Sequence, residues 1–114
     1  MIDSYKFGHI VIDGITYKND VVVFLDHVQS EWWRKEGHKL QIEDILDQLK
    51  EAEPEVLVVG TGKFGLMRIG DDLKDYLDET GIRLVVENTD RAVSTYNRVV
   101  ENGDRVLGAF HLTC

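Results

Sequence analysis

The second half of the chain alternates strand-like apolar runs with amphipathic segments, and this alternation constrains the fold more than any other feature. Val56–Val59, Ile82–Glu87 and Arg105–His111 are short apolar runs typical of strands. Between them, residues 71–79 and 90–102 place apolar side chains at helical spacing. Strands separated by helices of this length need crossover connections, which make parallel pairs. We therefore predict that these three strands share one sheet.

The first part of the chain predicts β structure followed by a long connection. Phe7–Ile12 and Ile15–Tyr17 flank Asp13-Gly14, a pair that favours a two-residue turn, so we predict a hairpin. Val21–Leu25 is a continuous apolar run, which suits a strand that is buried on both faces. From residue 26 to residue 39 the periodicity fails, and this stretch is predicted to be a long connection.

One further helix completes the predicted architecture. Ile42, Ile45 and Leu49 share one face of it, and Pro54 helps to end it. A chain of 114 residues is the length of one domain and is enough to bury one core. We predict the α/β class: a single three-layer domain over residues 1–114, with a central mixed, largely parallel sheet flanked by helices and an N-terminal β-hairpin extension.

Charge and composition exclude several classes of function. Lys and Arg number 13 against 21 Asp and Glu, so the net charge is −8. So acidic a surface repels phosphate backbones and anionic lipid, and we predict no nucleic-acid partner. We also predict no membrane span, because no apolar run is long enough. The first residues have neither a basic segment nor an apolar one after it, so we expect a cytoplasmic protein.

Residues that usually carry metal or nucleophilic chemistry are few and scattered. The only cysteine is Cys114, so no intrachain disulfide or thiolate cluster can form. His9, His27, His38 and His111 lack the close spacing of histidines that clasp a metal, and we predict no metal site. No serine or threonine lies in a nucleophile-elbow signature, so the sequence identifies no catalytic residue.

A glycine motif after a predicted strand is the most enzyme-like signal. Gly60-Thr61-Gly62-Lys63-Phe64-Gly65 matches the G-x-G-x-x-G pattern of dinucleotide sites, and Glu87 lies near the position of a ribose-binding acid. In such a site, however, the helix begins within the motif, so that its amides face the pyrophosphate. Here Arg68-Ile69-Gly70 intervene, and the helix opens with Asp71-Asp72, which would repel a phosphate. We therefore predict that no cofactor binds.

Two interpretations of the glycine motif stay open. The glycines can permit a tight turn with positive φ. Alternatively, their backbone N–H groups, with Lys63 and Arg68 nearby, can cradle a small anion. Ligand crevices of open α/β sheets lie at the carboxyl edge of the strands, next to the start of the 90–102 helix. The candidate binding cleft comprises Gly60, Thr61, Gly62, Lys63, Phe64, Gly65, Arg68, Asn88, Tyr96, Asn97 and Arg98.

Trp32-Trp33-Arg34 forms a second candidate site. Adjacent residues of a regular element point in different directions, so both indoles can enter one core only if the backbone is irregular. We expect one tryptophan in the core. The other, together with Arg34, is a candidate interaction surface, because Trp and Arg are favoured anchors at interfaces.

Several motifs in this order resemble a small α/β family. They are Ser30-Glu31-Trp32-Trp33-Arg34 with Gly37-His38, then Pro54-Glu55 through Gly60-Thr61-Gly62, then Thr89, Ala92, Thr95-Tyr96-Asn97 and Arg105-Val106. The family includes the mitochondrial complex I assembly factor 3 and the adipogenesis-associated domain protein, with many uncharacterised microbial members. The resemblance covers nearly the whole chain. It implies a three-layer fold with a central mixed sheet and an N-terminal β extension.

For function, the resemblance implies action through protein partners, since the mitochondrial relatives act in assembly of a respiratory complex, and it carries over no catalytic residue. We predict a non-enzymatic protein-interaction or assembly-type module with an unidentified protein partner. The alternative is a small-ligand or anion-binding protein, or an enzyme, with its site at the Gly60–Gly65 loop and the start of the 90–102 helix. The sequence leaves the oligomeric state open.

Overall fold

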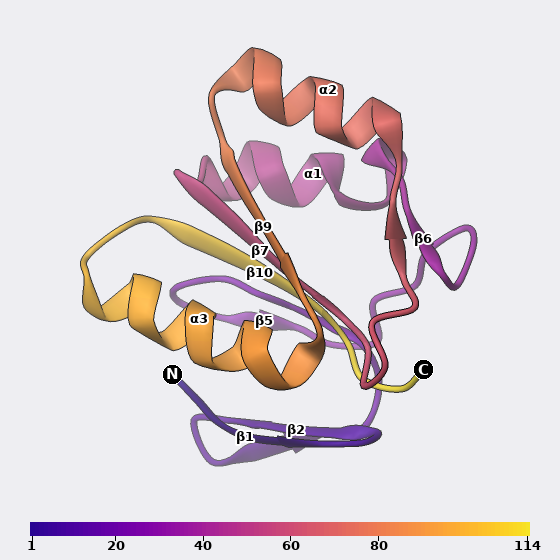
Figure 1. Cartoon of the computed structure of the whole chain (residues 1–114). Coiled ribbons are helices and arrows are strands. Elements are labelled where there is room, and N and C mark those ends of the chain that lie inside the picture. Colours follow the sequence, from indigo (N-terminus) through magenta and orange to yellow (C-terminus); the bar gives the residue numbers. More distant parts are fainter.

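The computed structural model, which describes residues 1–114, is built in three layers (Figure 1). A five-stranded sheet forms the middle layer, two helices cover one face, and a helix with a small three-stranded sheet covers the other. The elements are β1 (Ile2–Lys6), β2 (His9–Ile12), β3 (Ile15–Tyr17), β4 (Val21–Val23), β5 (Val28–Gln29), β6 (Lys39–Leu40), α1 (Ile42–Ala52), β7 (Val56–Thr61), β8 (Arg68–Ile69), α2 (Asp71–Thr80), β9 (Arg83–Glu87), α3 (Thr89–Glu101) and β10 (Val106–His111).

The central sheet has the strand order β5-β4-β10-β7-β9. β10 pairs with β7 in parallel, and β7 pairs with β9 in parallel, so the prediction that the three late strands share one sheet is confirmed. β4 runs antiparallel to β10 and makes the sheet mixed. Every residue of β7 and of β10 is buried, because both faces of these inner strands are covered.

Two apolar cores lie on opposite faces of the sheet. α1 and α2 pack on one face, where Ile45, Leu49, Leu73 and Leu77 meet the side chains of β7 and β10. α3 packs on the other face together with β1 and β2. The alternation of strand residues between the two faces explains why the run in β7 is continuously apolar. No helix is both long and apolar enough to cross a bilayer.

The N-terminal hairpin is confirmed, and it belongs to a larger unit than the sequence predicted. β2 and β3 pair around Asp13-Gly14, whose φ angles of 49° and 81° suit a two-residue turn. β1 adds a third strand, antiparallel to β2, which its polar composition concealed. The amide of Asn97 on α3 accepts from Ile2 N at 2.9 Å and donates to Ile2 O at 2.8 Å, so it fastens β1 to the helix.

The predicted connections contain short strands. β5 lies in the 26–39 stretch, and β6 begins at its end. β7 continues through Gly60 and Thr61, which the sequence placed in a loop. β8 then pairs in parallel with β6, with Lys39 opposite Arg68 and Leu40 opposite Ile69. This separate two-stranded sheet ties the two connections together.

Candidate functional site

The carboxyl ends of the parallel strands meet at one edge of the sheet. His111 of β10 is level with Thr61 of β7, and Gly60 is level with Glu87 of β9. β4 runs the opposite way and starts beside Phe110, which brings Asp20 to the same edge. Open α/β sheets place ligand crevices at this edge. We call it the carboxyl edge.

Asp20, Arg34 and His111 form a buried charge network at the carboxyl edge. His111 Nδ1 lies 2.7 Å from Asp20 Oδ2, and Arg34 Nη2 donates to the same oxygen at 2.8 Å. The other carboxylate oxygen accepts from Leu112 N at 2.8 Å. The side chains of Asp20, Arg34 and His111 are only 12%, 4% and 9% exposed. The network thereby joins the start of β4, the connection between β5 and β6, and the end of β10.

Asp20 stays ionised in this network. Burial acts most strongly and by itself raises the pKa of the carboxyl, but hydrogen bonds from His111, Leu112 and Arg34 together outweigh it and lower the pKa. An ionised Asp20 fixes the tautomer of the neighbouring imidazole, because His111 Nδ1 must carry the proton that it donates.

Arg34 is a structural residue, and the expectation that it lies on a contact surface is wrong. Its Nε and Nη2 donate to Gly37 O at 3.1 and 2.9 Å, and its guanidinium lies 4.9 Å from the centre of the Trp32 ring. Trp32 is the core tryptophan, and its Nε1 donates to Asp44 O at 3.0 Å. Trp33 is 68% exposed, so it alone of the three predicted residues can meet a partner.

The network contains the aspartate and the histidine of a catalytic triad but no nucleophile. An aspartate that orients a histidine through Nδ1 occurs in nucleophilic triads, where Nε2 faces a hydroxyl or thiol. Here His111 Nε2 and Arg34 Nη1 are buried and have no hydrogen-bond partner, so no nucleophile completes a triad. Nor do the side chains gather three or more metal-binding groups. The arrangement stiffens the edge and offers two polar atoms beneath the surface.

The glycine loop does not form the anion cradle that the sequence allowed. Gly62 N donates to Thr89 Oγ1 at 2.9 Å, Lys63 N donates to Thr113 O at 2.9 Å, and Gly65 N donates to Gly62 O at 3.3 Å. These amides are therefore engaged by the protein and do not converge on a common hollow. Lys63 Nζ lies 2.9 Å from a carboxylate oxygen of Asp90, which neutralises the cation expected to attract a ligand.

Close packing explains the glycines at 60 and 62. A Cβ on Gly60 would lie 2.9 Å from both a Phe110 ring atom and Thr89 Oγ1. Gly62 has a φ of 101°, and its Cβ would lie 2.6 Å from Thr113 O. Thr89 Oγ1 also donates to His111 O at 2.6 Å, so it clamps α3 to both β7 and β10. The motif is a joint between strands and helix.

The other predicted cleft residues are dispersed. Asn88 caps α3 by accepting from Arg91 N at 3.1 Å, and Arg98 is exposed further along that helix. Tyr96 is buried and donates to Phe24 O at 3.5 Å, at the opposite end of β4 from Asp20. Burial above all raises its pKa, which keeps the phenol neutral. Asn97 holds β1. These four residues do not line one cleft.

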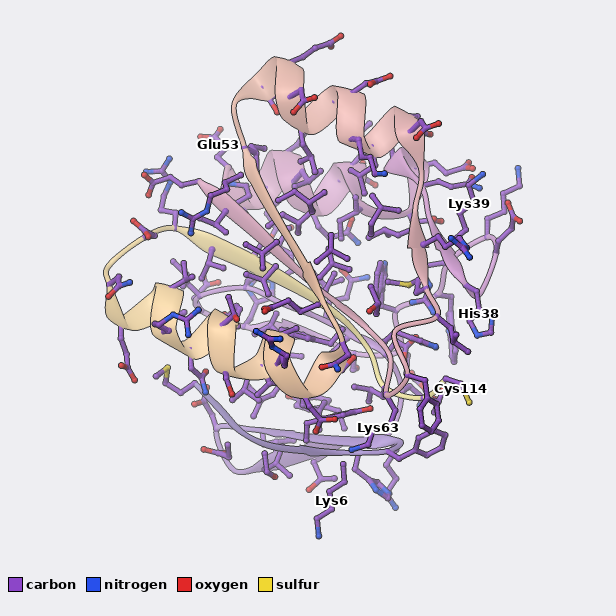
Figure 2. All side chains as sticks on the ribbon, in the orientation of Figure 1. Lys6, His38, Lys39, Glu53, Lys63 and Cys114 are labelled. Carbon is purple, nitrogen blue, oxygen red and sulfur yellow. The ribbon has the colours of Figure 1, made fainter.

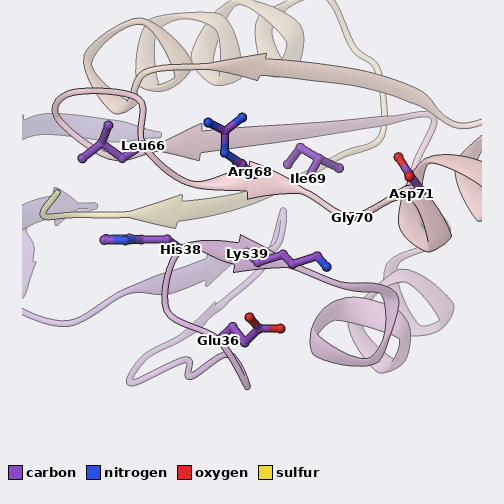
Figure 3. A pocket seen from close by; sticks show the side chains of 8 residues that line it. All are labelled: Glu36, His38, Lys39, Leu66, Arg68, Ile69, Gly70 and Asp71. Atoms are coloured by element: carbon purple, nitrogen blue, oxygen red, sulfur yellow. The ribbon is translucent and has the colours of Figure 1, made fainter.

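Arg68 faces a different hollow, of about 630 Å³, between the two short strands (Figure 3). Lys39 of β6 and Arg68 and Ile69 of β8 line it. The other lining residues are His38, which directly precedes β6, and Glu36, Leu66, Gly70 and Asp71. The ring of His38 meets that of His111 edge-on, with centroids 5.7 Å apart, so this hollow adjoins the buried network.

Sequence reasoning missed Asp20 and His111 as a pair. Each is a polar residue next to or at the end of an apolar strand, and this position is the one feature of the sequence that could have marked them as site residues. They are 91 residues apart, and only the antiparallel insertion of β4 beside β10 brings them into contact. Nothing in the local sequence specifies that neighbour.

The fold and the carboxyl edge together define a class of protein. It is an α/β domain of three layers in which a buried charge network holds the carboxyl edge together. The family model for a protein of unknown function, DUF498/DUF598, matches residues 2–111, and the chain belongs to that family.

Solved structures share this fold over the whole chain. The conserved hypothetical protein PH1505 from Pyrococcus horikoshii OT3 is 23% identical with a TM-score of 0.83, and the match covers 100% of this chain and 99% of that one. The protein described as MT938 is 28% identical with a TM-score of 0.82, over 100% and 98% of the two chains. A Mth938-like domain from Bordetella pertussis is 21% identical with a TM-score of 0.76, over 98% and 85%.

Proposed function

We propose that this chain is a non-enzymatic protein-interaction module of assembly type, with its contact surface on the loops at the carboxyl edge. One observation carries the proposal: four large apolar side chains are exposed on loops fastened to that edge. They are Phe7, Trp33, Phe64 and Leu66, which we call the edge apolar residues. Trp33 and Phe64 are the most exposed, at 68% and 69%. Exposed aromatic residues of this kind are typical anchors at protein interfaces.

The loops that carry these residues are tied to the edge by main-chain hydrogen bonds. Gly8 N donates to Leu112 O at 2.8 Å, Trp32 N to Asp20 O at 2.9 Å, and Lys63 N to Thr113 O at 2.9 Å. In Figure 2, Lys63 and Cys114 lie close together on the same side of the molecule as His38. The three loops therefore surround one end of the sheet.

The buried network supports this role by holding Trp33 in place. Its neighbours on either side, Trp32 and Arg34, are both buried and hydrogen-bonded. A side chain presented by an ordered backbone loses less entropy on binding, which favours affinity. The resemblance to a family that includes a respiratory-complex assembly factor points the same way.

The test compares partners captured by three tagged proteins in cells that express the chain. They are the wild type, the double variant Trp33→Ser with Phe64→Ser, and the control Ile15→Ser. Ile15 is an exposed apolar residue on β3, next to the Asp13-Gly14 turn. Quantitative mass spectrometry should find a protein that the wild type and the control retain and the double variant loses. The purified partner should then bind the wild type directly.

Binding of that purified partner with equal affinity to the wild type and to the double variant would contradict the proposal. So would the finding that no captured protein depends on these two side chains. Circular dichroism on both variants shows whether the fold is kept, since the substituted residues are exposed and should not contribute to the core.

A further inference from the structure

β9 is an edge strand whose outer side has no partner in the chain. It ends the central sheet, and in Figure 1 it lies in front of β7 and β10. The strand at the opposite edge, β5, has only two residues, whereas β9 has five. Its sequence, Arg83-Leu84-Val85-Val86-Glu87, has no proline or lysine, and its two charged residues stand only at its ends, so its middle lacks the residues that usually protect an exposed edge. We propose that β9 pairs with β9 of a second copy, antiparallel, and joins two sheets into one.

The hydrogen-bonding direction of β9 fits this pairing. Arg83 N donates to Glu55 O at 3.0 Å, and Glu87 O accepts from Thr61 Oγ1 at 3.0 Å, so the main chain of both residues faces β7. Main-chain groups alternate along a strand, and those of Leu84 and Val86 therefore point outward. In an antiparallel pair centred on Val85, Leu84 of each copy exchanges both hydrogen bonds with Val86 of the other.

The side chains select the same register. With Val85 on the two-fold axis, Arg83 of each copy stands opposite Glu87 of the other, and Leu84 stands opposite Val86. Arg83 is exposed and has no ion-pair partner within the chain. Glu87 accepts from Thr95 Oγ1 and lies 3.6 Å from the exposed Arg91 Nε, but its side chain is still 21% exposed and can meet a second cation. Opposite charges directly across a strand pair are stabilising. If the register of the pair is shifted by two residues in either direction, Val85 stands opposite Arg83 or Glu87 of the other copy. The remaining charged residue of each strand then has no opposite charge across from it.

The surface beside the strand has room for the second copy. Val86 is 44% exposed, although valine side chains on strands usually pack against neighbouring residues. A hollow of about 460 Å³ next to it is lined by Leu66, Ile69 and Lys74 among others. Leu84 of the second copy, opposite Val86, would reach the mouth of this hollow. An isologous contact of this kind closes on itself and gives a dimer.

The first experiment measures molar mass by light scattering and sedimentation across a range of concentrations. The wild type should weigh twice the 13.1 kDa of one chain. Val86→Lys should raise the dissociation constant of the dimer about tenfold or more, because a lysine on the edge opposes strand pairing. Ile15→Lys is the matched control, since it puts the same charge on another exposed strand residue, and it should leave the dimer unchanged.

The second experiment tests the register by charge exchange. Arg83→Glu gives a dimer with two pairs of opposed glutamates, and Glu87→Arg gives two pairs of opposed arginines, so each variant alone should be mainly monomeric. An equal mixture of the two should form a one-to-one heterodimer, because each pair of opposed charged residues at its interface then joins a glutamate of one chain to an arginine of the other. Arg98→Glu, an exposed change on α3, is the control and should dimerise as the wild type does.

A wild type that stays monomeric at millimolar concentration would overturn the proposal, and it would do so even if β9 received a strand from another protein. A dimer that tolerates Val86→Lys, or a mixture that fails to associate while both variants keep the native circular dichroism spectrum, would also overturn it. Leu66 borders both this contact and the partner surface proposed above. The variants at Arg83, Val86 and Glu87 leave all four edge apolar residues intact, so loss of the dimer can be told apart from loss of the partner.

Discussion

Replacing Asp20 by alanine should destabilise the fold strongly, because it leaves the charge of Arg34 buried without its carboxylate. The Arg34 side chain is 4% exposed, and Asp20 is the only carboxylate within 4.0 Å of it. Removing one member of a buried, hydrogen-bonded ion pair costs roughly 3–5 kcal/mol. For a chain of this size that corresponds to a fall in melting temperature of about 12–20 °C. His111 Nδ1 and Leu112 N lose an acceptor in the same step.

The assay is urea denaturation at neutral pH, followed by circular dichroism. Asp26→Ala is the matched control, because Asp26 also pairs with a histidine, at 2.6 Å from His27 Nδ1, but on the surface, and its loss should be barely measurable. The double variant Asp20→Ala with Arg34→Met should recover part of the lost stability, since it removes the stranded charge. A loss from Asp20→Ala no larger than that from Asp26→Ala would refute the reasoning.

Three further predictions concern the same edge. The pKa of Asp20 is lower in the folded state than in the unfolded state, where it is 3.8. Its contribution to stability is therefore present above pH 3.8 and is lost as the pH falls through the lower folded pKa. Measurements of unfolding at a series of acidic pH values should show this loss in the wild type and not in Asp20→Asn. Gly62→Ala should cost about 1–3 kcal/mol or more in thermal denaturation, because φ is positive and a Cβ would meet Thr113 O at 2.6 Å, whereas Gly37→Ala, with open space around it, should cost little. Titration with phosphate should leave the amide chemical shifts of residues 61–64 unchanged in NMR spectra, because the amides of Gly62 and Lys63 already donate to other groups of the protein. A saturable change in these shifts would show that the loop binds an anion after all.

Much of the layer architecture follows from the sequence alone. Apolar runs separated by amphipathic segments predict the three late strands, the helices between them and their shared sheet, because strand and helix periodicities are local properties. The Asp13-Gly14 turn likewise predicts the β2–β3 hairpin, since positive φ angles there are a property of the pair itself. The same logic placed one tryptophan of Trp32-Trp33 in the core, although it could not say which.

The tertiary structure alone decided the site. Gly60–Gly65 has the letters of a phosphate loop, yet its backbone is occupied by Thr89 and Thr113, which only the packing of α3 and the chain end against β7 brings near. Arg34 looks like a surface anchor until Asp20 and His111 surround it. These contacts join residues far apart in the chain, and their partners depend on strand order. Strand order is set by the global burial of apolar faces, which no local pattern encodes.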